Sequence, residues 1–445
     1  MIPLSTVEIA AATGGTTDVA IQVTGIATDS RDVSPGDLFV ALPGTRADGG
    51  EFVDAALAAG AAAALVPRAS PGPRRVHVDD PLVALGRIAA LLRQRSAARV
   101  VGITGSTGKT STKDVLRALL EPHVSVVASR ENQNNELGVP LTLCRTGQGT
   151  EVVVAEMAMR GLGQIAYLAE IALPDVAVIT SVGPVHLELL GTVERVAQAK
   201  AEILHHLAVG GVAVVPAGEP LLRPHLAEHA GRVVGFGDGE DADVRLVAFR
   251  RMEGGGEAEI ALHGRTLNVP VNFTSRHDAL NLTAAAAVYD VLGLPADELA
   301  RGAGDVRFSR WRGEEIELPG GGLLIADCYN ANPTSMAAAL RHLADVSEGR
   351  RTVAVLGHVA EHGDMAELGP DGPAHHAEVG RQADELGIEL VVAVGELARS
   401  YGGSWFATRD EAVGAIGELL APGDVVLVKG SRSMGLEAVV EAVAP

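Results

Sequence analysis

The sequence predicts an α/β protein with three domains, and three observations support this prediction. The chain has 445 residues, enough for two to four domains of ordinary size. Hydrophobic residues make up 47% of the chain but aromatic residues only 3%, so the core must be built from Ala, Val, Leu and Ile. From residue 100 onwards, short apolar runs typical of buried parallel strands alternate with helical patterns, as they do in βαβ units.

The first segment, residues 1–97, is expected to form a smaller N-terminal α/β domain. Ser5 and Glu8 stand at capping-box spacing and predict a helix at the start. Asp80 as N-cap and Pro81 at the first helical position predict a second helix, which ends in a linker. Its apolar residues recur on one face: Leu82, Leu85, Ile88, Ala89 and Leu92.

The second segment, residues 98–309, is expected to form a central domain around a P-loop-type, doubly wound, mostly parallel sheet. Four apolar runs predict its strands, at 100–104, 152–155, 176–180 and 212–215. Helical patterns lie between or after these runs, at 109–120, 193–206 and 277–293. A more polar, alternating stretch at 237–275 predicts a small antiparallel excursion.

The third segment, residues 310–445, is expected to form a Rossmann-like α/β domain. Apolar runs predict its strands at 323–327, 353–356, 390–394 and 425–428, each followed by a helical pattern.

Composition excludes several classes of protein. The formal net charge is −20 and no basic run appears, which argues against a nucleic-acid partner. Two cysteines, Cys144 and Cys328, cannot make a disulfide framework and fit a reducing compartment. The N-terminus has no basic n-region, and the longest near-apolar run (55–66) is too short for a bilayer. We therefore expect a cytoplasmic protein without membrane insertion.

The stretch VGITGSTGKTSTK (101–113) predicts a nucleotide-binding loop. An apolar strand, a glycine turn and a helix follow one another, so backbone N–H groups and the helix N-terminus can face an anion. Lys109 would reach the β- and γ-phosphates and Thr110 would ligate magnesium. The alternative is a glycine-rich βα turn with a chance G-K-T. The nucleotide-binding residues predicted here are Gly105, Ser106, Thr107, Gly108, Lys109, Thr110 and Ser111.

Two further side chains stand where predicted strands end. Glu156 ends the run 152–155, and His186 follows the run 176–180 after a Gly-Pro turn. The carboxyl ends of parallel strands meet at one edge of a sheet, where ligands bind. Both are therefore predicted magnesium ligands, with an N-capping Glu and a surface His as the alternatives.

This loop resembles the G-x-x-G-K-[ST] loop of the Mur ligases, the ATP-dependent amide ligases of peptidoglycan synthesis. The resemblance runs along nearly the whole chain, through NNELGVPLTL (134–143), EMAMRGLGQIAYL (156–168), PDVAVITSVGPVHLELLGT (174–192) and AQAKAEIL (197–204). DCYNANPTSMAAAL (327–340) and VLVKGSRSMGLE (426–437) resemble the branch that adds D-Ala-D-Ala to UDP-MurNAc-tripeptide. The resemblance implies an ADP-forming ligase with ATP and two Mg²⁺ sites, and we expect a monomer.

The resemblance also implies roles around the ATP. Lys200 would be carbamylated and so become a carboxylate-like magnesium ligand, although a lysine on a helix is normally a solvated end. Together Lys109, Glu156, His186 and Lys200 would be the catalytic residues. Asn281 would bond the adenine edge, unless it is only a polar position on an Ala-rich helix. Three further residues would contact ribose and phosphates: Arg312, Asp327 and Asn330, with Arg310 as a competing register for the arginine.

The resemblance implies two substrate sites. ATDSRDVSPGDLFVALPG (27–44) resembles a segment that holds the uridine diphosphate, with Ser30 and Arg31 as contacts. The alternative is a buried structural Asp–Arg pair in a turn. Asn134 and Asn135 are further predicted substrate-binding residues. The predicted contacts of the incoming dipeptide are Lys429, Ser431 and Arg432, with Arg432 on its free carboxylate.

Some positions depart from the family pattern. Ser181 and Val185 replace the usual Asn and Ala, and Gly50 stands where the family has D-G-H. The stretch GHVAEHGDMAELG (357–369) is a near-duplication, which leaves open whether Glu361 or Glu367 holds the usual place.

The predicted reaction is ATP-dependent phosphorylation of the terminal carboxylate of UDP-MurNAc-tripeptide, followed by attack of the D-Ala-D-Ala amine on the acyl phosphate. The nearest alternative is a related ligase with another substrate, such as D-Ala-D-lactate or a secondary metabolite. Folate-type ligases fit less well because they would not need the TDSR segment. An ATP-binding partner protein and a transporter subunit are alternatives from other classes. Whether the third acceptor residue is lysine or diaminopimelate stays open.

Overall fold

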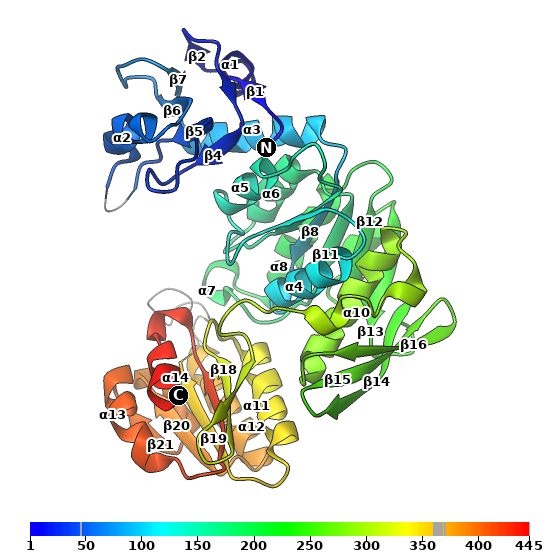
Figure 1. Cartoon of the computed structure of the whole chain (residues 1–445). Coiled ribbons are helices and arrows are strands. Elements are labelled where there is room, and N and C mark those ends of the chain that lie inside the picture. Colours follow the sequence, from blue (N-terminus) through cyan, green and yellow to red (C-terminus); the bar gives the residue numbers. More distant parts are fainter. Residues whose placement is uncertain (45–46, 359–367, 369–370, 445) are drawn as a thin grey trace.

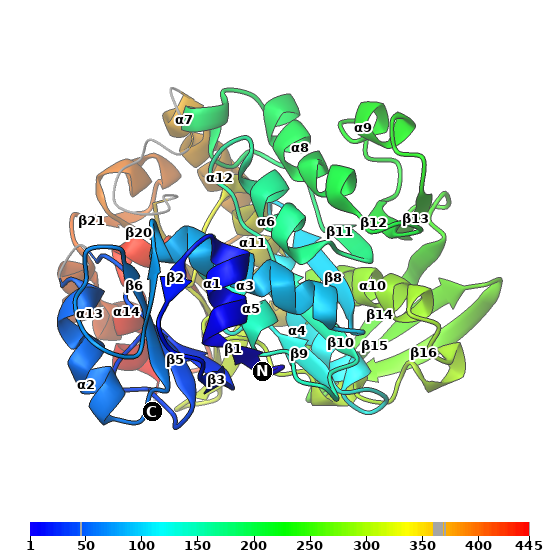
Figure 2. The same ribbon diagram turned by 90° about the horizontal axis from the view of Figure 1, so that it is seen from above.

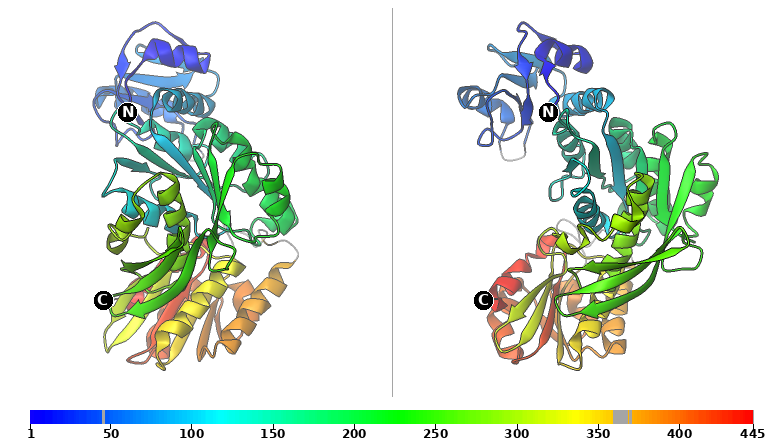
Figure 3. Two further views of the ribbon diagram at one scale, coloured as in Figure 1. Left: turned by 90° about the vertical axis from the view of Figure 1, so that its right-hand side faces the viewer. Right: turned by 45° about the vertical axis from the view of Figure 1, so that its right-hand side comes forward.

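The computed structural model describes residues 1–44, 47–358, 368 and 371–444. Each of the three predicted segments contains its own sheets, and the segments follow one another along the molecule (Figure 1). The side views show the same succession, with the N-terminal and C-terminal parts at opposite ends (Figure 3). The three-domain α/β prediction is confirmed. We propose the boundaries 97/98 and 309/310, because no sheet crosses either of them.

The N-terminal part is built on a five-stranded sheet of order β2-β7-β6-β5-β4, parallel except at β2. Its strands are β2 (Thr16–Thr17), β4 (Gly25–Ala27), β5 (Asp37–Val40), β6 (Ala63–Pro67) and β7 (Arg75–Val78), with β1 (Leu4–Ser5) paired separately to β3 (Gln22–Val23). Its first helices are α1 (Thr6–Thr13) and α2 (Val53–Ala58). Ser5 and Glu8 form the predicted capping box at the start of α1.

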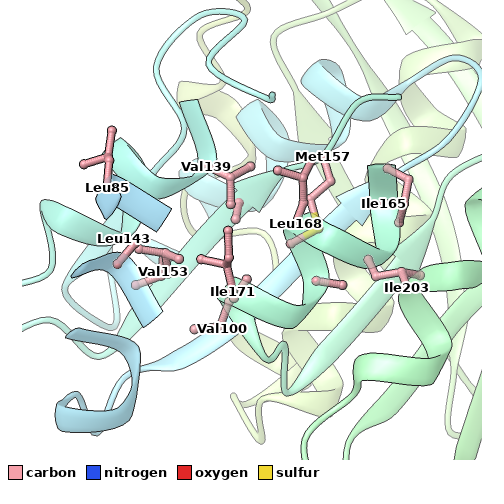
Figure 4. Close-up of a cluster of buried hydrophobic side chains, with 14 of the residues drawn as sticks. Leu85, Val100, Val139, Leu143, Val153, Met157, Ile165, Leu168, Ile171 and Ile203 are labelled. Carbon is pink, nitrogen blue, oxygen red and sulfur yellow. The ribbon is translucent and has the colours of Figure 1, made fainter. Parts of the chain in front are cut away.

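Helix α3 (Pro81–Arg95) connects the N-terminal part to the central one. It begins as predicted, with the Asp80 side chain accepting hydrogen bonds from the backbone N–H of Leu82 and Val83. It packs against α1 and also against α5 (Gly138–Cys144) and α6 (Gln164–Ala172). In Figure 2, helix α3 lies next to both α1 and α5. Figure 4 shows Leu85 in one apolar cluster with Leu143 and Ile171. The two parts therefore share a core.

The central sheet has nine strands in the order β16-β15-β14-β13-β12-β11-β8-β10-β9. Its strands are β8 (Arg99–Thr104), β9 (Val126–Ala128), β10 (Val152–Glu156), β11 (Val176–Ile179), β12 (Val212–Pro216), β13 (Arg232–Gly237), β14 (Val244–Met252), β15 (Gly255–Leu262) and β16 (Arg265–Val271). The strands from β9 to β14 pair in parallel, whereas β14, β15 and β16 pair antiparallel, which confirms the predicted excursion. Strand β8 lies between β10 and β11, so the ends of three neighbouring strands meet.

Helices cover both faces of this sheet. Helices α4 (Lys109–Leu120) and α10 (Arg276–Val291) pack together on one face. Helices α5, α6 and α8 (Val193–Ala201) lie in the core of the other face. The helix predicted at 193–206 changes at residue 202 into the 3₁₀ helix η2 (Glu202–His206). Short helices α7 (Leu187–Leu190) and α9 (Arg223–Ala227) complete this part.

The C-terminal part is a six-stranded doubly wound sheet of order β17-β18-β22-β19-β20-β21, parallel except for the β17–β18 pair. Its strands are β17 (Glu314–Leu318), β18 (Gly322–Asp327), β19 (Thr352–Gly357), β20 (Leu390–Val394), β21 (Ser404–Phe406) and β22 (Val425–Lys429). The cores on its two faces contain residues of α11 (Pro333–Ser347) and α12 (Gly372–Glu385), and of α13 (Arg409–Leu419) and α14 (Glu437–Val443).

Three remaining predictions concern particular residues. Cys144 and Cys328 are both free and buried. No helix within the described ranges has the length and apolarity needed to cross a membrane. Most of the near-duplication at 357–369, including Glu361 and Glu367, lies outside the described residues.

Candidate active site

The predicted nucleotide loop connects β8 to α4 in a tight turn. Gly105 has φ 153°, and a Cβ added there would overlap the Thr180 hydroxyl. Gly108 has φ 80° and precedes α4, whose first turn contains Lys109, Thr110 and Ser111. Glycine is therefore required at both positions, by close approach at the first and by a left-handed backbone at the second. The Lys109 Nζ donates a 2.8 Å hydrogen bond to the carbonyl oxygen of Gly105, so it lies across the loop.

The loop is braced by the segment that follows β11. The Ser106 hydroxyl donates to the Gly183 carbonyl (3.1 Å) and accepts from the Gly183 N–H (2.9 Å). The Thr107 N–H donates to Oγ of Ser181 at 2.9 Å. Ser181 is one of the departures from the family pattern, and its hydroxyl acts here as a loop support.

Glu156 lies at the end of β10, beside the loop, and is 1% exposed. Its Oε2 accepts a 2.9 Å hydrogen bond from the Thr110 hydroxyl, and its Oε1 accepts one of 2.9 Å from Nδ2 of Asn134. Both donors are neutral. A buried carboxylate is costly without a positive partner, so this group fits a divalent cation. The sequence predicted Glu156 and Thr110 as ligands, and the structure places them in contact.

His186 and Lys200 come from the neighbouring strand connection. His186 directly precedes α7, with φ 53°, and Lys200 lies near the end of α8. Lys200 is only 2% exposed. Its position near the end of a helix suggests a solvated side chain, but the fold buries it. Within the described part of the chain, no three His, Cys, Asp or Glu side chains gather where they could hold a metal.

The lysines are confined to this region and to the sheet edge of the C-terminal part. The chain contains four of them: Lys109, Lys113, Lys200 and Lys429. The last three are each 2% exposed. Lysine is among the residues least often fully buried, so three buried lysines indicate specific roles for their amines.

Asn281 on α10 lies against the start of α4. A Cβ added to Gly108 would come 2.5 Å from Oδ1 of Asn281, and the Thr112 hydroxyl donates to the same oxygen at 3.4 Å. The Asn281 Nδ2 donates to Oδ1 of Asp278 at 3.1 Å. The structure therefore places Asn281 beside the nucleotide loop, and its contact with adenine stays a prediction.

The C-terminal part meets the same loop through the start of α11. Nδ2 of Asn332, the N-cap of α11, donates to the carbonyl oxygen of Ser106 at 3.5 Å. The Thr334 hydroxyl lies so near Gly183 that an added Cβ would come within 2.8 Å of it. The helix N-terminus, with its positive dipole end, therefore faces the phosphate loop. Sequence reasoning missed Asn332, although Asn before Pro333 is a recognisable N-cap signal.

Asp327 and Lys429 end two adjacent parallel strands and pair with each other. The Lys429 Nζ donates to Oδ2 of Asp327 at 2.7 Å and to the carbonyl oxygen of Asn330 at 3.0 Å. Lys429 is therefore buried and bonded inside the domain, and its predicted contact with the incoming dipeptide stays a prediction. Ser431 is also fully buried, and its hydroxyl bonds the Ser433 hydroxyl at 2.9 Å. The side chain of Arg432 is 52% exposed.

Tyr329 lies between the two predicted arginines. The guanidinium carbon of Arg312 is 4.1 Å from the centre of the Tyr329 ring, and that of Arg432 is 5.9 Å from it. Arg310 instead stacks on Trp311 at 4.5 Å. The choice between Arg312 and Arg310 stays open, with Arg312 contacting Tyr329 and Arg310 contacting Trp311. Sequence reasoning did not single out Tyr329.

The predicted UDP-binding residues lie on the surface of the N-terminal part. Arg31 is 86% exposed and pairs with Asp29, with a 2.9 Å hydrogen bond from Nε to Oδ1. A buried structural pair, the alternative interpretation, is therefore wrong. Asn135 uses its side chain locally, since Oδ1 accepts from the Gly138 N–H at 3.0 Å. Ser30 lies beside Arg31 and is half-buried.

A cleft of about 960 Å³ lies between the N-terminal and central parts. Gly25, Asp32 and Ser34 line one side of it, near the predicted UDP segment, and Arg130 and Arg145 line the other. Burial, together with the charge of Arg130, lowers the pKa of Arg145 to about 10. The cleft lining carries charges of both signs, and Arg130 and Arg145 are the basic side chains on the side formed by the central part.

Comparisons with known proteins agree with this architecture. Residues 22–100 match the description "Mur ligase family, catalytic domain", 103–289 "Mur ligase middle domain" and 311–432 "Mur ligase, glutamate ligase domain". A UDP-N-acetylmuramoyl-tripeptide–D-alanyl-D-alanine ligase of Bacillus subtilis (strain 168) is 34% identical over 432 residues, covering 94% of this chain and 92% of that protein. A protein of the same name from Escherichia coli (strain K12) is 34% identical, covering 95% and 94%.

Solved structures show the same similarity. A crystal structure of MurF from Acinetobacter baumannii has a TM-score of 0.88 and 29% identity, covering 99% of this chain and 98% of that one. A MurF ligase from Thermotoga maritima in complex with ADP has a TM-score of 0.84 and 30% identity, covering 94% and 97%. The chain therefore belongs to the Mur ligase family, among relatives named UDP-N-acetylmuramoyl-tripeptide–D-alanyl-D-alanine ligase.

Proposed function

We propose that this chain is an ATP-dependent, ADP-forming ligase that adds D-Ala-D-Ala to UDP-MurNAc-tripeptide in peptidoglycan precursor synthesis. The observation that carries the proposal is the Thr110–Glu156 contact beside the nucleotide loop. It places a buried carboxylate next to the residues that would bind a nucleotide phosphate. The names of the full-length relatives and the ADP bound to the Thermotoga maritima protein support the same assignment.

The nucleotide loop would bind and orient the phosphates of ATP. Lys109 would leave the Gly105 carbonyl and contact the transferred phosphoryl group, whose negative charge must be neutralised as it approaches a carboxylate. Asn281 would contact the adenine, and Arg312, Asp327 and Asn330 the ribose and phosphates. Asp327 could do so through its second oxygen, since Oδ2 is bonded to Lys429.

We further propose two Mg²⁺ sites, with Thr110, Glu156, His186 and a carbamylated Lys200 as ligands. Bound magnesium would offset the charge of the phosphate oxygens. The burial of Lys200, which is 2% exposed, supports a specific role for this lysine beside the nucleotide loop, because lysine is among the residues least often fully buried. Converted to a carbamate, it would become an oxygen ligand for the cation.

The substrates would enter from opposite sides. Ser30, Arg31 and the cleft with Arg130 and Arg145 would hold the anionic UDP-MurNAc end, and Asn134 would lie where the peptide reaches the loop. On the other side, Arg432 would bind the carboxylate of D-Ala-D-Ala. Ser431 and Lys429 would shape that site from within the domain. We propose that the enzyme is a cytoplasmic monomer; the two free, buried cysteines Cys144 and Cys328 fit a reducing compartment.

An omission assay tests the proposal. Phosphate release is measured with ATP, Mg²⁺, UDP-MurNAc-tripeptide and D-Ala-D-Ala, and then with each component left out. Release should require all four. Parallel arms with lysine or diaminopimelate as the third residue, and with D-Ala-D-lactate as the second substrate, distinguish the related ligases. Phosphate release that does not depend on D-Ala-D-Ala or D-Ala-D-lactate contradicts the proposal. ATP binding without any phosphate release also contradicts it.

A further inference from the structure

A carboxylate on α4 holds the linker that leads into the C-terminal part. Asp114 lies one helical turn after Thr110 and is 7% exposed. Its Oδ2 accepts two hydrogen bonds from Ser309, from the backbone N–H at 2.9 Å and from the hydroxyl at 3.0 Å. Its Oδ1 lies 3.2 Å from Nζ of the buried Lys113. A buried, paired carboxylate is costly to disconnect, so this contact fixes Ser309 to the helix of the nucleotide loop.

Ser309 lies where the linker changes its attachment. Before it, the linker is bound to the central part: Nδ2 of Asn272 donates to the Val306 carbonyl at 2.8 Å, and the Phe308 ring packs on Phe273. After it, the linker is bound to the C-terminal part, through the Tyr329 N–H donating to the Trp311 carbonyl at 3.1 Å. The attachment therefore passes from one domain to the other between residues 309 and 311.

The backbone just beyond Ser309 has the geometry of a pivot. Trp311 has φ 64° and Gly313 has φ 73°, both left-handed. Such a conformation is unusual for a bulky residue and stores strain. Arg312 lies between these two residues, and the start of α11 contacts Ser106 through Asn332. A rotation about this pivot would move both Arg312 and α11 relative to the phosphate loop.

We propose that the Asp114–Ser309 link is the fixed end of this pivot, and that Asp114 is a positioning residue for the reaction. Asp114 holds the linker at Ser309, the residue where rotation begins. Arg312 and the start of α11 would then reach the nucleotide in one orientation of the C-terminal domain. Without the link, residues 306–310 could move as well, and the C-terminal domain would close over a range of positions. The effect of this domain orientation on turnover rests on the proposed function, but the Asp114–Ser309 link itself does not.

Tryptophan fluorescence tests the link without any peptide substrate. The chain has two tryptophans, Trp311 at the pivot and Trp405 in β21. In a Trp405→Phe background, Trp311 becomes the only one and reports on the pivot as Mg²⁺-ADP is titrated. The parent should give a saturable change. Asp114→Ala should reduce its amplitude at least twofold, while the Kd of ADP, measured by calorimetry, changes by less than about threefold.

Kinetics test the effect on the reaction. Asp114→Ala should lower kcat by about 10- to 100-fold, the effect of misplacing reacting groups, with the KM of ATP nearly unchanged. Asp114→Asn keeps an oxygen that accepts from Ser309 and should recover most of the rate. Ser309→Ala should give a smaller loss than Asp114→Ala, and none in the Asp114→Ala background, because the two residues act through one contact. Glu170→Ala, an exposed change on α6, is the control and should leave both readouts unchanged.

The possible outcomes separate the two proposals. An unchanged Trp311 response and kcat in Asp114→Ala overturn the link, and so does additivity of the Asp114 and Ser309 substitutions. If Asp114→Ala does not fold, Ser309→Ala decides by the same two readouts. If the parent forms no amide product but its Trp311 response to ADP depends on Asp114, the proposed function fails and the link stands.

Discussion

The hydroxyl of Thr110 donates a 2.9 Å hydrogen bond to Oε2 of Glu156, 46 residues further along the chain. Thr110 comes after strand β8 at the start of α4, and Glu156 is the last residue of the neighbouring parallel strand β10. The carboxyl ends of these two strands lie side by side. Two residues that the sequence predicted as magnesium ligands from separate motifs are thus already in contact. The relationship makes Glu156 the sharpest point at which to test the proposed cation site.

Glu156→Gln should lower the Mg²⁺-dependent kcat by a factor on the order of 100, because the amide keeps the shape but loses the charge that holds a cation near the phosphates. Initial rates at increasing Mg²⁺ check this. Glu170→Gln, an exposed change on α6, is the control and should leave the curve unchanged. An unaltered Mg²⁺ dependence in Glu156→Gln would remove this residue from the ligand set.

Carbamylation of Lys200 can be detected directly because the chain has only four lysines. After incubation with ¹³C-bicarbonate, one carbamate signal is expected in the ¹³C spectrum. It should vanish in Lys200→Ala together with turnover, and added short carboxylic acids should restore part of the rate by supplying the missing oxygens. The signal should persist in Lys113→Arg. A fully active Lys200→Ala protein would rule out the modified lysine as a ligand.

The Asp327–Lys429 pair predicts that Lys429 acts on stability, not on substrate affinity. Lys429→Met leaves the Asp327 carboxylate without its charged partner and should lower the free energy of unfolding by about 3 kcal/mol. The exposed Arg432→Met should change it by less than about 0.5 kcal/mol but raise the KM of the dipeptide. Denaturant unfolding and initial rates measure both. Normal stability with a raised KM in Lys429→Met would mean that its amine faces the substrate after all.

Glu315 in β17 predicts a pH dependence of the contact between the central and C-terminal parts. Burial raises the pKa of its carboxyl, but hydrogen bonds from His342 and Thr274 and the charge of Arg251 outweigh burial, so its pKa lies below the ordinary value of 4.5. Its stabilising contribution is therefore complete above pH 4.5 and is lost as the pH falls through the lowered pKa. Thermal unfolding from pH 6 down to 3 should show this loss in the parent. Glu315→Gln should be less stable at pH 6 and lack this component, and an identical pH profile in the variant would contradict the assignment.

Much of the fold could be predicted because it depends on local pattern. The helix at 109–120 begins and ends where the sequence indicates, and the capping groups Ser5 and Asp80 act as expected. The apolar runs are short and continuous, which is what a sheet covered on both faces requires. Strand order was not predicted, since it depends on which apolar surfaces pack together.

The site was predictable where a motif carries its own backbone geometry. The loop from Gly105 to Thr110 is such a motif, and Glu156 was predicted from its place at a strand end. The burial of Lys200 and Lys429 was not predictable, because a helix or strand position does not say what packs over it. The contacts of Tyr329 with two arginines and of Asp114 with Ser309 join residues from distant segments, and no local signal marks them.

The sequence by itself determined the α/β class, the three segments, the nucleotide loop and the family resemblance, because each is written in residues that are close along the chain. Only the tertiary structure decided which charges are buried and paired and which stay exposed. Lys429 is buried and paired inside the domain, whereas Arg31 and Arg432 are exposed at the surface. The physical reason is that burial and pairing are properties of the packed whole, where a side chain's free energy depends on neighbours that the chain brings from far away.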